Sequence, residues 1–277
     1  PAGVGKKTVA RAFARALLCT QPREGDACAR CRACRQVQEG NHPDLFLVQP
    51  APHTIKIDQL RELQRRVALT PYQSSRQVCL LERAEAMTGE AANCFLKTLE
   101  EPPGEVIFIL ISGQPYALLP TVVSRCQQVV FHHLPTVAVV EGLTRLAGLD
   151  KARAELPAVL AGGSLSRALN LVAEGNLATQ REQVFTTAAA LAKVSSGEAC
   201  RLARNFAGER EELQIFLDLL LLWYRDLLVW RTAGDEELIV NRDFLPLLKR
   251  EAENCTLSRF IDIIYAIEQA KNHLRAN

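Results

Sequence analysis

The amino-acid sequence predicts an α/β domain with a parallel sheet, followed by a region built only of helices. Three short apolar runs separated by helical stretches lie in residues 1–134, and a glycine-rich segment opens directly into a helix. From Pro135 onward the sequence shows helical periodicity and no convincing strand. Apolar runs that alternate with helices are what a parallel sheet with helices on both faces requires.

The first region is predicted to combine three strands with helices and a cysteine-rich loop. Lys6–Leu18 is predicted as a helix whose apolar face carries Val9, Phe13, Ala16 and Leu17, and a cysteine-rich loop follows at residues 19–34. Strands are expected at residues 45–48, 78–81 and 106–111, with helices at 57–66 and 89–99. A helix-like stretch at 116–123 and a strand-like run at 129–131 end the region.

The second region divides at glycines. Short helices are expected at residues 136–146, 151–160 and 164–173, with breaks at Gly148 and Gly162-Gly163, and Gly175-Asn176 ends the group. Longer helices follow, including 211–231 and 257–274. We therefore expect three parts, at residues 1–134, 135–176 and 177–277.

Composition limits the class of protein. The 277 residues carry 33 basic and 31 acidic side chains, a net charge of +2, which excludes a uniformly basic nucleic-acid coat. Residues 1–35 contain eight basic and two acidic groups, so this segment is +6 and the remainder is −4. No apolar run predicts a membrane span and no signal peptide is evident, so we expect a reducing, cytoplasmic location. The sequence begins inside the glycine-rich motif of residues 1–8, so we expect the first strand of the sheet to precede residue 1.

Residues 1–8 resemble a phosphate-binding loop, in which glycines aim backbone N–H groups at phosphate oxygens. Gly3, Gly5, Lys6 and Thr8 are the candidate nucleotide-binding residues. The residue after Lys6 should carry a hydroxyl for Mg²⁺, but it is Lys7, whose ammonium has no lone pair for a metal. A glycine turn that only begins a helix is the alternative.

Four cysteines have the spacing of a metal site: Cys19, Cys28, Cys31 and Cys34. Four thiolates satisfy tetrahedral Zn²⁺ and leave no open coordination position, so a structural zinc site is predicted. Arg30, Arg32 and Arg35 are placed to offset its net charge of −2. Four ordinary free cysteines are the alternative. The remaining five are interpreted as isolated small hydrophobic residues: Cys79, Cys94, Cys126, Cys200 and Cys255.

Two further motifs accompany the loop. The run 78–83 is similar to a strand that delivers an acid to Mg²⁺, with Glu82 as the candidate ligand. Arg83 stands where a catalytic base would be, and a guanidinium cannot accept a proton. A plain strand edge is the alternative. In Ser124-Arg125-Cys126, the arginine is either an ordinary surface charge or a finger that reaches a neighbouring subunit's nucleotide.

Together these motifs resemble one family, the delta-prime subunits of the bacterial DNA polymerase III clamp loader, which are AAA+ proteins. The matching segments are the cysteine spacing after Leu17-Leu18, Gly40-Asn41-His42-Pro43-Asp44, Ala91-Ala92-Asn93, the run from Leu96 to Pro103, and Ser124-Arg125-Cys126. They follow the family's order through residues 1–134. In this family His42 belongs to a structural turn.

The resemblance implies a fold and a role. The expected fold is an α/β P-loop AAA+ core, a parallel sheet with helices on both faces and a zinc module, followed by a small helical lid and an all-α collar. The expected partners are the gamma/tau and delta subunits in a hetero-pentameric ring, and through them the sliding clamp and primer-template DNA. Arg125 would supply the trans arginine finger to a motor subunit.

Within this family the chain is interpreted as the stator, which does not hydrolyse ATP. Lys7 and Arg83 occupy positions where ATP chemistry needs a hydroxyl and an acid, and Ser166 stands where motor subunits carry an arginine, with Arg167 one place later. Whether a nucleotide binds without hydrolysis stays open. The alternatives are a gamma/tau-type motor that hydrolyses ATP and a stand-alone zinc-dependent DNA-binding module.

Overall fold

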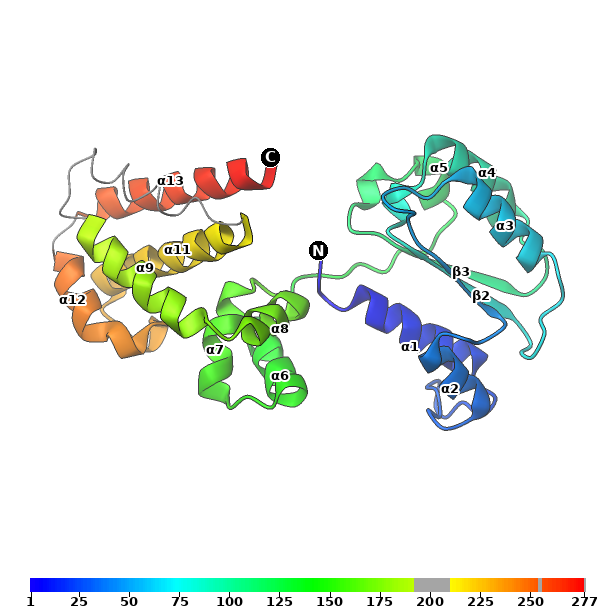
Figure 1. Ribbon diagram of the computed structural model, residues 1–277, viewed down its shortest axis with the longest axis horizontal. Helices are drawn as coiled ribbons and strands as arrows, with labels where there is room; N and C mark the ends of the chain where they lie inside the picture. The colour runs from blue at the N-terminus through cyan, green and yellow to red at the C-terminus, as the bar shows by residue number, and fades with distance from the viewer. Residues whose placement is uncertain (192–209, 254–255, 277) are drawn as a thin grey trace. The chain divides into compact units, whose positions relative to one another are not determined.

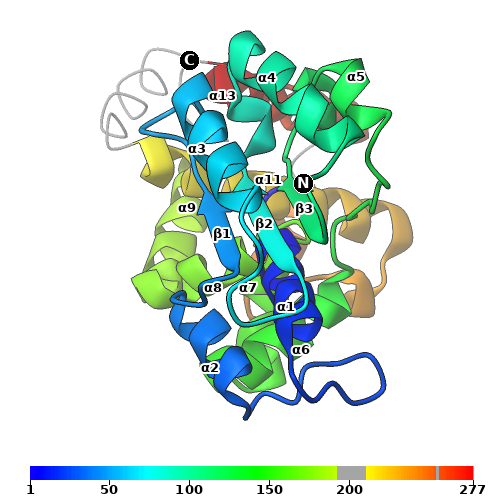
Figure 2. The same cartoon turned by 90° about the vertical axis from the view of Figure 1, so that its right-hand side faces the viewer.

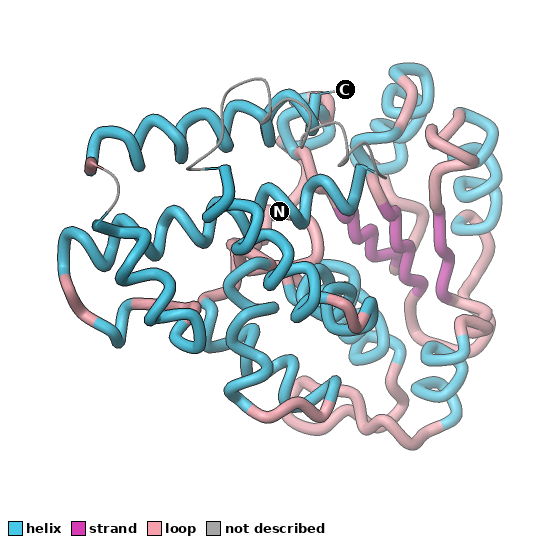
Figure 3. The backbone as a smooth tube through the Cα atoms, turned by 60° about the vertical axis from the view of Figure 1, so that its left-hand side comes forward, coloured by secondary structure: helices cyan, strands magenta, loops and turns pink. Residues whose placement is uncertain are grey.

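The computed structural model describes residues 1–191, 210–253 and 256–276. The chain forms two compact units, Pro1–His132 and His133–Asn277, each described here by itself. All strands of the described residues lie in the first unit, and the second is built of helices (Figure 3). The predicted combination of a parallel sheet and a helical carboxyl-terminal region is therefore confirmed.

Three parallel strands form the sheet of the first unit: β1 (Leu45–Val48), β2 (Gln77–Glu82) and β3 (Val106–Ile111). Their order is β1-β2-β3, with Leu45 opposite Val78 and Val78 opposite Ile107 (Figure 2). The apolar runs predicted all three, because a strand covered on both faces has no polar side to interrupt it.

Alternate side chains of β2 face two different helical layers. Cys79 and Leu81 pack with α3 (Ile57–Val67) and α4 (Gly89–Glu100), whereas Val78 and Leu80 pack with α1 (Lys6–Leu18) and α2 (Arg32–Glu39). Figure 1 shows α3 and α4 on one side of the strands and α1 and α2 on the other. The period-two alternation of a strand thus builds two cores on one sheet.

The buried face of α1 differs from the prediction. Ala10, Ala14 and Leu18 are buried, whereas Val9 and Phe13 are about half exposed, at 52% and 51%. Small alanine side chains allow the helix to approach β2 closely, and this contact outweighs the larger area that Phe13 could bury.

Two local predictions also need correction. The cysteine loop was expected to run through residue 34, but α2 already begins at Arg32 because the Cys31 side chain caps it. Residues 129–131 were expected to be strand-like, yet they form no strand, and Val129 and Val130 are exposed. A strand needs a hydrogen-bonding partner, and β3 pairs only with β2 among the described strands. The helix-like stretch before them forms a 3₁₀ turn, η2 (Pro115–Ala117), and the short helix α5 (Pro120–Val123).

The second unit holds two apolar clusters. One gathers Val139, Leu143, Ala154 and Ala158 from α6 (Thr136–Ala147) and α7 (Lys151–Leu160), with Ala168 from α8 (Leu165–Glu174). The other centres on Trp223, Phe185 and Phe260. Most of its residues come from α9 (Leu177–Leu191), α11 (Arg210–Ala233), α12 (Leu245–Glu253) and α13 (Leu257–Ala276), with the 3₁₀ turns η3 (Glu236–Leu238) and η4 (Arg242–Phe244) nearby. Leu160 of α7 and Leu171 of α8 also belong to it.

The helices that the sequence predicts in this unit are present at nearly the predicted bounds. Of the isolated cysteines, Cys79 is buried and Cys94 and Cys126 are half-buried, while Cys200 and Cys255 lie outside the described residues. No single helix of the described residues is long and apolar enough to cross a membrane; α7 and α8 pass such a test only as a pair bent by 115°.

Candidate metal centre and phosphate-binding loop

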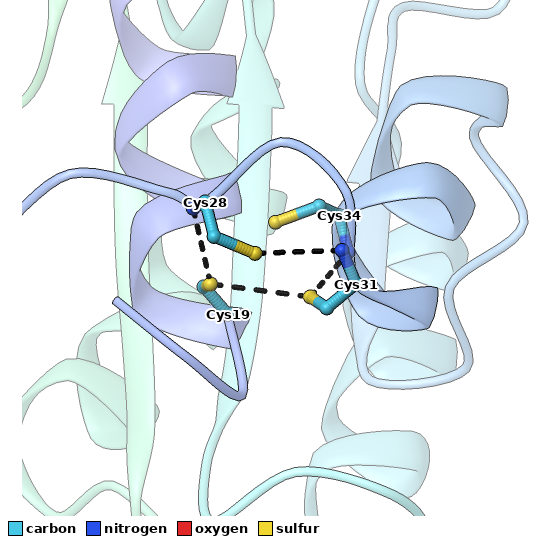
Figure 4. A group of neighbouring side chains, drawn as sticks. All are labelled: Cys19, Cys28, Cys31 and Cys34. Carbon is cyan, nitrogen blue, oxygen red and sulfur yellow. Dashed lines mark hydrogen bonds between the residues drawn. The ribbon is translucent and has the colours of Figure 1, made fainter. Parts of the chain in front are cut away.

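The four predicted cysteines form one group beside α1 and α2 (Figure 4). Cys19 directly follows α1, Cys31 caps α2, and Cys34 lies in the first turn of α2. The turn between Cys28 and Cys31 is made possible by Ala29, whose φ of +59° lies in the left-handed region. The two helices therefore deliver ligands from both sides of the loop.

Backbone N–H groups point at three of the sulfur atoms. The Sγ of Cys19 accepts from the N–H of Cys28, that of Cys28 from the N–H of Cys31, and that of Cys31 from the N–H of Cys34, each at 3.4 Å. These donors favour the thiolate form, which is the form that binds metals.

The thiol pKa values of Cys28, Cys31 and Cys34 are shifted in different directions. The pKa of Cys28 lies below its ordinary value, chiefly because the backbone N–H of Arg30 donates to the sulfur. Burial would raise the pKa of Cys31, but hydrogen bonds from Thr20 and from the backbone of Cys34 lower it to about 5. Burial and the neighbouring thiols raise the pKa of Cys34 to about 12. A cation bound by all four sulfurs must therefore displace a proton from Cys34.

The geometry of the group fits a tetrahedral metal ion. All four sulfur atoms lie within 4.8 Å of one another, and those of Cys19 and Cys31 are 3.9 Å apart. Zinc–sulfur bonds of about 2.3 Å in a tetrahedron place the sulfurs about 3.8 Å from each other. The four cysteines can therefore hold a metal ion without rearrangement of the backbone.

The candidate phosphate loop has the backbone that its glycines predict. Gly3 and Gly5 have φ values of +70° and +93°, and Gly5 is the residue at which α1 begins. Only glycine adopts such angles without strain. The ammonium of Lys6 hydrogen-bonds to the carbonyl oxygen of Pro1, so the lysine closes over its own loop.

Glu82, at the end of β2, is surrounded by cationic and amide donors. The Nζ of Lys7 lies 2.8 Å from its Oε2, and the Nε2 of Gln49 donates to the same oxygen at 2.8 Å. A guanidinium nitrogen of Arg11 lies 3.7 Å from Oε1. Lys7 and Arg11 are four residues apart on α1, so both side chains face the carboxylate.

This arrangement does not fit a magnesium ion. Mg²⁺ requires oxygen ligands in a near-octahedral shell, and the position beside Glu82 is taken by an ammonium that offers no lone pair. Thr8, the remaining hydroxyl of the loop, is exposed, and one residue along a helix is a turn of about 100°. The loop and Glu82 therefore do not form a magnesium site.

Arg125 lies two residues after the end of α5 and is held at the surface. Its Nη1 donates to the carbonyl oxygen of Thr121 at 2.9 Å, and its Nη2 forms a hydrogen-bonded ion pair with Glu100, the last residue of α4. The side chain keeps 35% exposure. A guanidinium that is oriented by its own chain and still accessible is able to reach another molecule.

His42 and Asp44 form a buried structural anchor. The Nδ1 of His42 accepts the N–H of Asp44 at 3.1 Å. The Asp44 carboxylate in turn accepts the backbone N–H groups of Tyr72, Gln73 and Ser74 at 2.6–2.8 Å. His42 therefore lies in a structural turn, as predicted, and this turn fixes the loop before β2.

Comparison with known proteins agrees with these features. Residues 1–135 match the family described as "DNA polymerase III, delta subunit", and residues 176–277 match "DNA polymerase III, delta subunit, C terminal". DNA polymerase III subunit delta' of Pseudomonas aeruginosa is 38% identical over 240 residues, which cover 86% of this chain and 72% of the relative. The Bacillus subtilis delta' subunit is 32% identical over 281 residues, which cover 99% and 83%. The chain belongs to the DNA polymerase III delta' family.

Similarity to the tau subunits is weaker. The Bacillus subtilis tau subunit is 24% identical over 263 residues, which cover 87% of this chain and 46% of that protein. The delta' assignment is therefore favoured over a gamma/tau motor.

The structure brings the predicted residues together in part. The four cysteines form one group, Lys7 lies against Glu82, and Arg125 is held separately by α4 and α5. Sequence reasoning missed Gln49, Arg11 and Glu100 as partners. The spacing of Lys7 and Arg11 was a signal for the cluster around Glu82, because two cations on one face of a helix are often paired with an acid. Nothing in the sequence linked Glu100 to Arg125, which are 25 residues apart.

Proposed function

We propose that this chain is a stator of the DNA polymerase III clamp loader, which helps to place the sliding clamp on primed DNA and does not hydrolyse ATP itself. The observation that carries the proposal is the relation to delta' subunits, at 38% and 32% identity over most of the chain. Its partners would be the gamma/tau and delta subunits in a hetero-pentameric ring, with the clamp and primer-template DNA engaged by the assembly.

In this proposal the three predicted parts have distinct tasks. Residues 1–134 would be the AAA+ core, 135–176 the lid and 177–277 the collar that joins the ring. Helices α6–α8 have an apolar cluster of their own, which supports a division of the helical region, although Leu160 of α7 and Leu171 of α8 also join the larger cluster of the helices that follow. Gly3, Gly5, Lys6, Thr8 and Glu82 would be remnants of a nucleotide site.

A structural Zn²⁺ would join α1 to α2 through Cys19, Cys28, Cys31 and Cys34. The charge balance supports zinc: Arg30, Arg32 and Arg35 form no salt bridge with an acid among the described residues, so they can offset the net −2 of the metal group. The thiols are free, which suits the reducing cytoplasm.

Arg125 would stabilise the transition state at the ATP site of the neighbouring motor subunit. The planar guanidinium matches phosphate oxygens in a bidentate manner. Its ion pair with Glu100 would fix the direction of the side chain before a neighbour arrives. Such a finger is worth about 10³- to 10⁵-fold at the site it serves.

The experiment is ATP hydrolysis by the reconstituted complex with gamma/tau and delta. Arg125→Ala should lower turnover of the complex without abolishing it, because only one site depends on this residue. Arg125→Lys should restore little of the turnover, because an ammonium cannot bind two phosphate oxygens in the bidentate manner of a guanidinium. Arg153→Ala, at an exposed arginine paired with Asp150, is the matched control and should leave turnover unchanged. Normal turnover of an assembled Arg125→Ala complex would refute the role.

A further inference from the structure

Lys7 stands where a phosphate loop carries a hydroxyl, and its ammonium is paired with the carboxylate of Glu82. Glu82 is at the carboxyl end of β2 beside the phosphate loop, and its side chain is only 13% exposed. We infer that the Lys7 ammonium, whose side chain is 48% exposed, takes the place of the divalent cation, so that its ion pair with Glu82 joins the loop to β2 and excludes Mg²⁺.

The helix geometry explains why Lys7 and not Lys6 does this. The two residues are consecutive in the first turn of α1, so their side chains point about 100° apart. Lys6 turns to the carbonyl oxygen of Pro1, which leaves Lys7 directed at the strand.

The surroundings of Glu82 strengthen the exclusion. Oε2 already accepts from Gln49 and faces Lys7, and Oε1 faces Arg11. A divalent cation at this carboxylate would meet the positive charges of Lys7 and Arg11, whose side chains are 48% and 53% exposed. The network also reaches α3, because the Nε2 of Gln59 donates to the carbonyl oxygen of Gln49 at 2.8 Å. One carboxylate thus ties α1, β2 and the end of β1 together without a nucleotide.

This inference deepens the proposed function and rests on it only in the expectation that the loop hydrolyses nothing. A stator that keeps its loop folded without ATP would hold one conformation throughout the reaction cycle. The ion pair itself is tested in the isolated chain, whereas the stator role is tested in the complex, so the two can fail separately.

The first test is the response to Mg²⁺ of ATP binding, measured by isothermal titration calorimetry. The wild-type chain should show no gain in affinity when Mg²⁺ is added. Lys7→Thr restores a hydroxyl and removes the nearer of the two cations from Glu82, so Mg²⁺ should raise its ATP affinity by about tenfold, a common size of coupling between two ligands. The double variant Lys7→Thr/Glu82→Gln should lose that gain. Lys151→Thr, at an exposed lysine in the first turn of α7, is the matched control and should behave as wild type.

The second test needs no nucleotide. Lys7→Met leaves the Glu82 carboxylate without its nearest cation and should lower the melting temperature by about 2–4 °C. Adding Glu82→Gln to Lys7→Met should recover part of that loss, because the charge to be paired is gone. Additive melting shifts would overturn the internal pair. A Mg²⁺-dependent gain in the wild-type chain, or no gain in a folded Lys7→Thr chain, would overturn the exclusion of the metal.

Discussion

At the scale of single residues, two poorly exposed carboxylates are paired by groups of the chain itself. The carboxylate of Glu82 is matched by Lys7, and the carboxylate of Asp44 is matched by three backbone N–H groups. A buried or partly buried carboxylate is costly unless its oxygens are paired, so each of these acids fixes the loop that pairs it. His42 is likewise a buried polar side chain that is paired within the chain, because its Nδ1 accepts the N–H of Asp44.

Burial of His42 makes the stability of the chain depend on pH. Burial lowers the pKa of His42 below its ordinary 6.5, although the nearby Asp44 opposes the shift. The unfolded chain therefore binds a proton at His42 at pH values where the folded chain does not. The contribution of His42 to the free energy of unfolding is fully present above pH 6.5 and falls as the pH drops from 6.5 toward the folded-state pKa. His42→Asn, whose amide oxygen can accept the Asp44 N–H, should flatten this part of the profile.

The measurement is urea unfolding at a series of pH values. At neutral pH, His42→Ala should cost about 1–3 kcal/mol, because the buried N–H of Asp44 loses its partner. His53→Asn, at an exposed histidine, is the control and should leave the profile as in wild type. A His42→Asn profile that falls as steeply as wild type below pH 6.5 would contradict this account.

At the scale of elements, the sequence predicted what periodicity controls and missed what tertiary contacts control. The three strands were predictable because apolar runs such as 106–111 have no amphipathic alternative. The buried face of α1 could not be predicted from periodicity, because packing against β2 favours Ala10 and Ala14 over the larger Phe13. Residues 129–131 show the same limit: a strand depends on a partner that lies elsewhere in the chain. The cysteine group was predictable from spacing, whereas the Lys7–Glu82 pair needed the sheet to bring residues 75 positions apart into contact.

Three helices of the second unit meet at one buried acid. Asp218 on α11 is 9% exposed, with Arg167 of α8 at one oxygen and Lys271 of α13 at 3.0 Å from the other. Arg167 is the residue one place after the position where motor subunits carry an arginine, and here it binds within its own chain. Asp218 therefore links α8 to α11 and α13, and the Arg167 guanidinium is held in an ion pair within its own chain.

Neutralising this acid should destabilise the chain. Asp218→Asn leaves two cations facing a neutral amide, one of them only 10% exposed, and we expect a loss of about 2–3 kcal/mol in the free energy of unfolding. Asp262→Asn, at an exposed acid on α13, should change it by less than about 0.5 kcal/mol. Urea unfolding followed by circular dichroism decides between them, and equal stability of the two variants would show that the cluster contributes nothing.

At the scale of the whole molecule, the two compact units have separate cores, and the cysteine group belongs to only one of them. Cys19 directly follows α1 and Cys34 lies in α2, and these helices cover one face of the sheet. A metal that binds only the folded state stabilises that state, so zinc should stabilise the first unit and leave the helical unit unaffected.

Zinc removal should therefore lower one melting transition and spare the other. Wild-type protein purified without chelators should carry about one equivalent of zinc, and a value below about half an equivalent would contradict the site. Cys28→Ser should lose the metal and lower the first unit's melting temperature in calorimetry. Cys94→Ser changes a half-buried cysteine outside the group and should keep both the zinc and the transition. Because Cys34 must give up its proton to bind, acid should release zinc and shift the same transition. A shift in the helical unit's transition, or none in the first, would mean that the metal does not join α1 to α2.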